Sequence, residues 1–270
     1  MGPQPGLAMP PSALLRAGDP PAVELFHSAA RQPVLLTCDH ASKAVPQALG
    51  LLGLAPEDLA RHIGWDIGAA EVTRRLAQKL DAAAILAGYS RLVIDCNRDP
   101  DDATSIPEAS DDVVVPANRG LGAEARAARR AALFAPYHAA IESWLEARLA
   151  RGEVPALLSI HSFTPAMGGK ARPWHVGILW DSDPRIPVPL MAALRADPAL
   201  EVGDNQPYSA KQPAGYTVRH HAVARGLPHV AVEIRQNLID SAAGAEAWAA
   251  RLAGLLGPIL ARPDIYRTLR

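Results

Sequence analysis

The sequence contains only two cysteines, Cys38 and Cys96, and both fall within predicted buried strands. Small secreted domains depend on several disulfides, so this count argues against a disulfide framework and favours a reducing cytoplasm. No apolar run approaches the roughly 20 residues that a membrane-spanning helix needs. The first residues also lack the charged segment and continuous apolar stretch of a secretory signal. These absences predict a cytoplasmic protein.

The chain also lacks an excess of charge of either sign, with 27 basic and 28 acidic residues among 270. This balance gives no electrostatic reason to expect nucleic acid or an anionic membrane as a partner, and it favours a small-molecule substrate. With 49% hydrophobic residues the chain can bury a substantial core, and we expect a single domain over residues 23–270. Six prolines among residues 1–22 predict a flexible N-terminal arm.

Hydrophobic periodicity predicts alternating strands and helices. Strands are expected at residues 34–37, 83–86, 92–94, 156–160, 175–180 and 229–234. Helices are expected from residue 56, over 67–80, over 123–150 with a break or kink at Pro136, and over 188–196, 217–224 and 242–260. This order predicts a three-layer α/β/α sandwich with a mixed, mainly parallel sheet. The polar residues 99–122 are expected to form a loop that covers a site.

Three of the predicted strands end at side chains that can bind a metal ion or transfer a proton. His40 follows the first strand, His161 ends the fourth, and Glu233 closes the last. Ligands of open α/β sheets bind outside the carboxyl ends of the strands, so these residues are expected to converge. Two imidazoles and a carboxylate suit a catalytic zinc ion, although manganese, iron or cobalt also fit such donors.

The third metal ligand has more than one candidate. Asp66 stands where a helix begins, a position in which an aspartate can also serve only as an N-cap. Asp39 lies beside His40, but strand alternation directs its side chain to the opposite face. Both interpretations of Asp66 stay open at this point.

Glu233 is a candidate general base. A carboxylate at that depth has a raised pKa if it is unpaired, and it can take a proton from water during attack on a carbonyl. The alternative is a salt bridge with Arg235 or with another arginine. Arg91, Asn97 and Arg98 lie within eight residues of one another, and arginine pairs both oxygens of a carboxylate. They are expected to anchor an acidic substrate or to stabilise an oxyanion, and a structural ion-pair network is the alternative.

Three segments carry a resemblance to known enzymes. Residues 159–163 (SIHSF), 95–99 (DCNRD) and 232–236 (VEIRQ) resemble segments of carboxypeptidase A-type zinc hydrolases in the same order. The chain more closely resembles the N-formylglutamate amidohydrolase family, whose pattern spans most of residues 34–260. One departure is Lys43, which stands where the carboxypeptidases carry a glutamate ligand.

The resemblance implies a phosphorylase/hydrolase-like fold with zinc held by His40, Asp66 and His161. It implies Glu233 as general base and acid, Asn97 and Arg98 as ligands of the substrate carboxylate, and Arg91 as a partner of the substrate or oxyanion. Residues 172–175 (RPWH) and 204–208 (DNQPY) are similar to a branch of the family described as predicted amidohydrolases. There, Trp174, His175 and Tyr208 are expected to line the pocket, and Tyr216 or Arg219 to lie near the substrate, although core packing explains these residues equally well.

The predicted function is zinc-dependent hydrolysis of an N-acyl, most simply N-formyl, acidic amino acid. One rival is a non-catalytic protein that binds a metal or a metabolite. Another is a cysteine-dependent amidase that uses Cys38 or Cys96 with a histidine. Cys38 lies two residues before His40 on the same strand face, so these two side chains could meet. Nucleotide-dependent chemistry is disfavoured, because the sequence has neither a phosphate-binding loop nor a dinucleotide-binding glycine motif.

Overall fold

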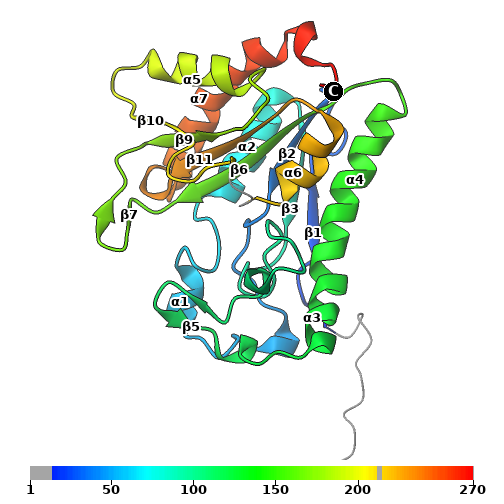
Figure 1. Ribbon diagram of the computed structural model, residues 1–270, viewed down its shortest axis with the longest axis vertical. Helices are drawn as coiled ribbons and strands as arrows, with labels where there is room; N and C mark the ends of the chain where they lie inside the picture. Colours follow the sequence, from blue (N-terminus) through cyan, green and yellow to red (C-terminus); the bar gives the residue numbers. More distant parts are fainter. Residues whose placement is uncertain (1–13, 212–214, 270) are drawn as a thin grey trace, which may run out of the picture.

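A seven-stranded sheet forms the centre of the molecule (Figure 1). The computed structural model describes residues 14–211 and 215–269. The strand order is β1-β3-β2-β6-β11-β9-β10. The strands are β1 (Val23–Phe26), β2 (Val34–Cys38), β3 (Ala83–Ala87), β6 (Ala156–Phe163), β9 (Val176–Leu179), β10 (Val202–Asp204) and β11 (His229–Arg235). Two small hairpins lie outside the sheet, β4 (Ala109–Ser110) with β5 (Val113–Val114), and β7 (Ala166–Met167) with β8 (Lys170–Ala171).

The sheet is mixed and mainly parallel, which confirms the predicted fold class. Strand β2 runs parallel to both β3 and β6, β6 runs parallel to β11, and β9 runs parallel to β10. Within this sheet, the pairs β1 with β3 and β9 with β11 are antiparallel. The carboxyl ends of β2, β6 and β11 therefore meet at one edge of the sheet. The sequence pattern does not predict strands β1 and β10, at the two margins of the sheet, because they are short and partly exposed.

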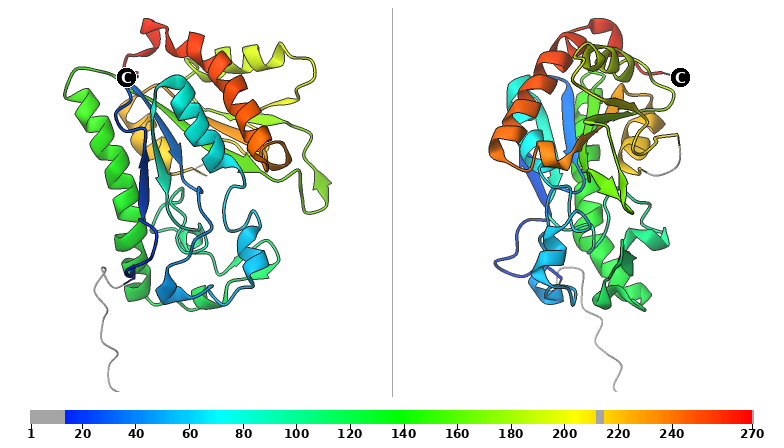
Figure 2. Two further views of the ribbon diagram at one scale, coloured as in Figure 1. Left: turned by 180° about the vertical axis from the view of Figure 1, so that it is seen from behind. Right: turned by 90° about the vertical axis from the view of Figure 1, so that its left-hand side faces the viewer.

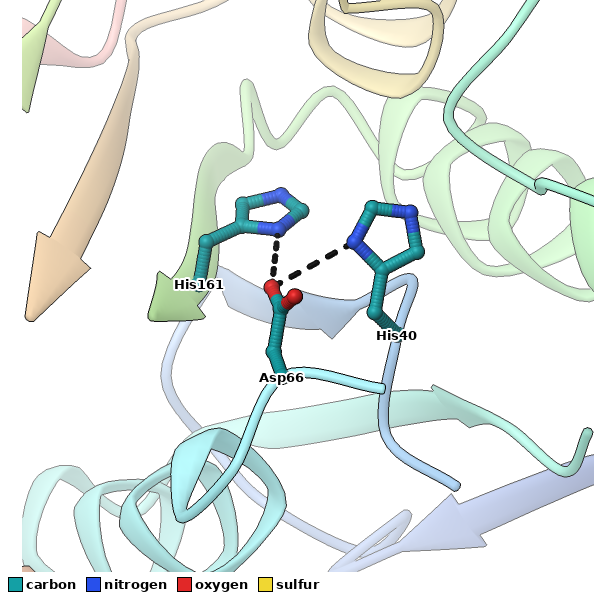
Figure 3. A group of neighbouring side chains, drawn as sticks. All are labelled: His40, Asp66 and His161. Carbon is teal, nitrogen blue, oxygen red and sulfur yellow. Dashed lines mark hydrogen bonds and ion pairs between the residues drawn. The ribbon is translucent and has the colours of Figure 1, made fainter. Parts of the chain in front are cut away.

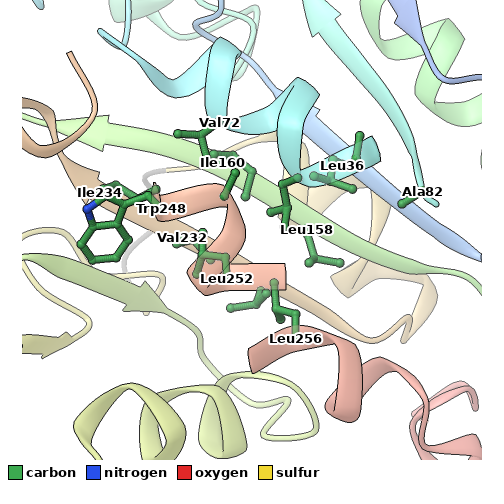
Figure 4. Packing of buried hydrophobic residues seen from close by; sticks show 14 of the residues in the cluster. Leu36, Val72, Ala82, Leu158, Ile160, Val232, Ile234, Trp248, Leu252 and Leu256 are labelled. Atoms are coloured by element: carbon green, nitrogen blue, oxygen red, sulfur yellow. The ribbon is translucent and has the colours of Figure 1, made fainter. Parts of the chain in front are cut away.

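Helices cover both faces of the sheet (Figure 2). The helices are α1 (Pro56–Ala60), α2 (Ala69–Leu80), α3 (Ala123–Arg129), α4 (Ala135–Leu149), α5 (Pro187–Arg195), α6 (Thr217–His221) and α7 (Ala242–Leu260). Alternate residues of each buried strand face opposite layers, as the two-residue period of a strand requires. Leu36 and Leu158 pack against α2, α5 and α7 (Figure 4), whereas Leu35 and Leu157 face α4 and α6.

A second lobe of loops and short helices lies beyond the carboxyl ends of β2 and β3. Its own apolar cluster includes Leu52, Leu59 and Ile63, together with Leu92, Val93 and Ile94. The prediction of a strand at 92–94 is wrong, because residues 92 and 93 lie in a turn and Ile94 belongs to no regular element. Their apolar character reflects burial in this second cluster, which a short apolar run cannot distinguish from a buried strand.

Two further segments concern the predicted N-terminal arm and the predicted break or kink at Pro136. Residues 14–22 of the predicted arm contact the domain: Leu14 is buried, and the Tyr89 hydroxyl donates to the Pro20 carbonyl. Residues 1–13 lie outside the described residues. Near Pro136 the helix neither breaks nor ends but passes through a π-helical segment, Arg130–Phe134, between α3 and α4. Such a wider turn accommodates a proline that has no N–H to donate.

Candidate active site

His40, Asp66 and His161 converge at the carboxyl edge of the sheet (Figure 3). Asp66 Oδ2 lies 3.3 Å from His40 Nδ1 and 2.9 Å from His161 Nδ1. One donor atom from each residue lies within 4.8 Å of the other two, and all three side chains are buried. The structure thus brings together the three side chains that the resemblance named as metal ligands.

The approach to α2 places Asp66. Its N–H donates to the His40 carbonyl (2.9 Å), which ties the loop before α2 to the end of β2. The helix itself is capped by Gly68 in the left-handed region (φ 81°), and no side chain caps it. The alternative that Asp66 is only an N-cap is therefore wrong, because its carboxylate faces the two histidines instead.

Two further carboxylates contact the outer nitrogens of the histidines. Asp95 Oδ1 lies 2.7 Å from His40 Nε2, and Asp39 Oδ2 lies 3.1 Å from His161 Nε2. A carboxylate that accepts from one imidazole nitrogen leaves the other nitrogen free to bind a metal. Asp39, the weaker ligand candidate in the sequence, thus lies behind His161 and outside the triad.

The donor set fits a divalent cation. Each imidazole faces a carboxylate at both ring nitrogens, yet a neutral imidazole carries only one N–H. Each ring would therefore carry an extra proton, unless its Nδ1 and the Asp66 carboxylate are ligands that would hold a cation. Burial opposes the charged form of His161, but hydrogen bonds to Asp39 and Asp66 outweigh it and raise its pKa well above the usual range. Asp66 forms a buried cluster of carboxylates with Asp39, Asp95 and Glu233. Among the described residues, its guanidinium contacts are Arg91, at 2.9 Å from Asp95, and the more distant Arg98, at 3.9 Å from Asp95.

Glu233 lies beside the triad, opposite His161 in the parallel pairing of β11 and β6. It is 6% exposed, and its Oε2 has no hydrogen-bond partner within the described part of the chain. Burial raises the pKa of Glu233 to about 7. The alternative salt bridge with Arg235 is wrong, because that guanidinium donates to Asn237 Oδ1 and the Pro173 carbonyl. Glu233 is therefore available to exchange a proton.

Arg91, Asn97 and Arg98 all line the cavity above the triad. Arg91 Nη2 donates to Asp95 Oδ2 (2.9 Å) and Nη1 lies 3.6 Å from Asp66 Oδ1, so Arg91 is part of an ion-pair network. Arg98 Nε is 3.9 Å from Asp95 Oδ2, and its side chain is 38% exposed. Asn97 Oδ1 accepts from the N–H groups of residues 216 and 217, which fixes the start of α6.

Three predicted pocket residues lie elsewhere. Trp174, His175 and Tyr216 are not among the described residues that line the cavity. His175 Nδ1 accepts from the Glu201 N–H (2.9 Å), and Tyr216 stacks on the His220 ring with centroids 4.7 Å apart. Packing therefore accounts for these side chains. Tyr208, by contrast, does line the cavity, and its hydroxyl accepts from Arg172 Nη1 (3.2 Å).

The hydrogen bonds that support Asp39 are not predicted by any pattern in the sequence. Thr217 Oγ1 and the Tyr137 hydroxyl donate to Asp39 Oδ1 at 2.6 Å and 2.8 Å. Burial opposes ionisation of Asp39, but its interactions with His161 and Thr217 hold its pKa at about 2. No local pattern could have paired these residues, because Thr217 is 178 positions from Asp39.

The cavity has a volume of about 540 Å³. Residues 99–122 contribute Ser110 and Asp111 to its lining, and His62 Nε2 lies 2.6 Å from Asp111 Oδ2. Neither cysteine is among the described lining residues, and burial raises the pKa of both thiols well above the usual range. The cysteine-amidase alternative therefore lacks an accessible nucleophile.

The mixed sheet, with its histidines, aspartate and unpaired glutamate at one edge, defines an α/β protein with a hydrolase-type site. A family model for N-formylglutamate amidohydrolase matches residues 32–240. A solved gene product of Agrobacterium tumefaciens is 36% identical, with a TM-score of 0.88 over 92% of this chain and 98% of that one. The chain belongs to the N-formylglutamate amidohydrolase family and is an amidohydrolase.

A more distant structure shares the fold. The N-formylglutamate amidohydrolase of Ralstonia eutropha JMP134 is 19% identical, with a TM-score of 0.65 over 88% of this chain and 97% of that one. No curated protein sequence matches the chain significantly. Among the described residues, no helix is long and apolar enough to cross a membrane. The cytoplasmic location and the absence of a nucleic-acid partner stay predictions.

Proposed function

We propose that this protein hydrolyses the amide bond of an N-acyl acidic amino acid, with N-formylglutamate as the first substrate to test. His40, Asp66 and His161 would hold one divalent ion, most simply zinc. The observation that carries this proposal is the unpartnered carboxylate of Glu233 beside these three residues. A buried ionisable group without a partner is costly to the fold, so its presence beside a ligand set indicates a chemical role.

A divalent ion at this position would supply Lewis-acid chemistry, polarising a carbonyl and lowering the pKa of water. Glu233 performs the proton transfers. Its pKa of about 7 lets it accept a proton from the attacking water and then donate that proton to the departing amine nitrogen. Asp39 and Asp95 hold the outer nitrogens of the two histidines, which keeps both Nδ1 atoms directed at Asp66.

The substrate carboxylate would bind at the opposite side of the triad from Glu233. Arg98 is the better anchor, because its guanidinium is half-exposed in the cavity and makes only a 3.9 Å contact with Asp95. Arg91 is held by Asp95 and would act on the carbonyl oxygen or the near carboxylate oxygen. Asn97 keeps α6 in place with Oδ1, which leaves Nδ2 for the substrate.

The test is release of free glutamate from N-formyl-L-glutamate, with metal content measured in the same preparation. Chelated protein is expected to lose activity and to regain it with zinc. Arg98→Gln should lower kcat/KM about 10- to 100-fold, the value of one charge-assisted hydrogen bond. The matched control is Arg130→Gln, which removes an exposed arginine that is bound to Asp101 and does not line the cavity.

Full activity in metal-free protein would refute the metal assignment. A second comparison separates an enzyme from a binding protein. Glu233→Gln is expected to bind N-formylglutamate in calorimetry while turnover falls about 100- to 10,000-fold. If wild-type protein binds this ligand tightly but releases no glutamate or other amine from any N-acyl substrate, the non-catalytic alternative replaces the proposal.

A further inference from the structure

The cavity does not end at Glu233 but continues along β11. Glu233, Ala231 and His229 alternate along this strand, so they share one face, and all three line the cavity. At about 3.3 Å per residue, the distance from Glu233 to His229 is about 13 Å. The cavity therefore extends well beyond the point at which an amide bond would be cleaved.

The walls of this extension are mainly apolar. Leu179 of β9 lies opposite Ala231 in the antiparallel register, and Val218 and Val223 line the cavity from α6 and the turn that follows it. His229 lies at the end, where its Nδ1 donates to the Leu227 carbonyl (2.8 Å) and burial lowers the pKa of the ring. Three exposed charged residues also line the cavity: Asp181, Lys211 and Arg219. We call the part lined by Leu179, Val218, Val223 and Ala231 the β11 groove.

The groove exists because one layer of the sandwich is thin at this point. Helix α4 packs against β1 and β3, and the five-residue α6 packs against β6 and β11 (Figure 1). On the opposite face, the long α7 and α5 bury the strands fully. Small side chains such as Ala231 leave space under α6 that a larger residue would fill.

The order of the strands places the arginines, the triad and the β11 groove one after another along the cavity. Arg91 and Arg98 follow β3, the triad lies on β2 and β6 and ahead of α2, and Glu233 and the groove lie on β11 beside β9. A substrate whose carboxylate contacts Arg98, and whose amide lies between the triad and Glu233, directs its acyl group into the β11 groove. A formyl group adds only a hydrogen atom to the carbonyl carbon, so it leaves the groove empty.

We propose that the β11 groove binds an apolar extension of the acyl group, so that the substrates of this enzyme include N-alkanoyl or N-aroyl acidic amino acids larger than the formyl compound. This inference rests on the proposed function, because it uses the same anchor and the same cleavage point. Burial of one methylene group is expected to raise kcat/KM up to about fourfold.

The experiment compares N-formyl-, N-acetyl-, N-butyryl-, N-hexanoyl- and N-benzoyl-L-glutamate as substrates of the zinc-loaded enzyme. The acetyl, butyryl and hexanoyl amides have nearly equal intrinsic reactivity, so their differences report binding of the chain. We expect kcat/KM to rise at least about tenfold from acetyl to hexanoyl, from four added methylenes. A flat or falling series would overturn the inference.

Two variants test the location. Ala231→Leu fills the groove and should lower the hexanoyl-to-formyl ratio of kcat/KM at least about tenfold. Val223→Asp should lower this ratio by a similar factor, because it places a charge beside the apolar chain. Val223 is 41% exposed, so the fold tolerates a charge at this position. The matched control, Val188→Asp, changes a valine that is 43% exposed on α5, outside the cavity, and should leave the ratio unchanged. Unchanged ratios in both groove variants would overturn the inference.

The outcomes also separate this inference from the proposed function. Turnover of the formyl compound with no turnover of longer amides overturns the groove but keeps the function. If no amide in the panel is cleaved, the proposed function fails. In that case calorimetry with Glu233→Gln still tests the groove, since N-hexanoylglutamate should bind at least about tenfold more tightly than N-acetylglutamate, and equal affinity overturns the inference.

Discussion

Glu233 is expected to make the metal-free protein less stable as the pH rises, and Glu233→Gln should remove this dependence. Burial raises the pKa of this carboxyl group from its usual 4.5 to about 7. Each tenfold difference in proton affinity corresponds to about 1.4 kcal/mol, so ionisation of Glu233 costs roughly 3 kcal/mol more in the folded than in the unfolded chain.

The direction of this pH dependence follows from the number of protons that the folded and unfolded chains bind. Between pH 4.5 and about 7 the folded protein holds a proton on Glu233 that the unfolded chain has lost. The free energy of unfolding therefore falls as the pH rises through this window, and the full loss is present above pH 7. A glutamine carries no such proton, so its own burial cost is the same at every pH.

The measurement is urea unfolding of chelator-treated wild-type and Glu233→Gln protein at pH 5 and pH 8. The stability difference between the two proteins should shift by roughly 3 kcal/mol between these pH values, in favour of the variant at pH 8. Glu124→Gln, which removes an exposed carboxylate on α3, is the matched control. If the difference is the same at both pH values, Glu233 is not the buried, unpaired acid that the structure shows.

Three further predictions follow from the same structure. Thr217→Val removes a donor to Asp39 and should weaken zinc binding about 10- to 100-fold in a chelator competition, whereas Thr217→Ser keeps the donor and should bind zinc as the wild type does. Equal zinc affinities of Thr217→Val and wild type would show that Thr217 does not position His161. Burial lowers the pKa of His138 to about 4 and of His221 to about 3, so unfolding should become easier as the pH falls below about 6.5, and His138→Gln should flatten that dependence in thermal melts. Leu158→Ala, in the core under α7, should cost about 2 to 5 kcal/mol in urea unfolding, and a loss below 1 kcal/mol would contradict its tight packing.

Most elements of the sheet and its helices could be predicted from local pattern. The runs that became β2, β6 and β11 are apolar and short, and α7 begins and ends at the predicted residues 242 and 260. The run at 92–94 has the same local character as these strands, yet it packs in the second lobe. Residues 92–94 pack in the second lobe because of the side chains around them in space, and these side chains are distant in the sequence.

The positions of His40, His161 and Glu233 at strand ends can be recognised from local pattern, because a buried parallel strand is a continuous apolar run with a clear end. The role of Asp66, the contact of Asp39 with the outer nitrogen of His161, and the groove beside Ala231 depend on how distant segments pack. Periodicity reports which side chains are buried. Which buried side chains meet depends on the order and register of strands, and these are set by packing between segments far apart in the chain.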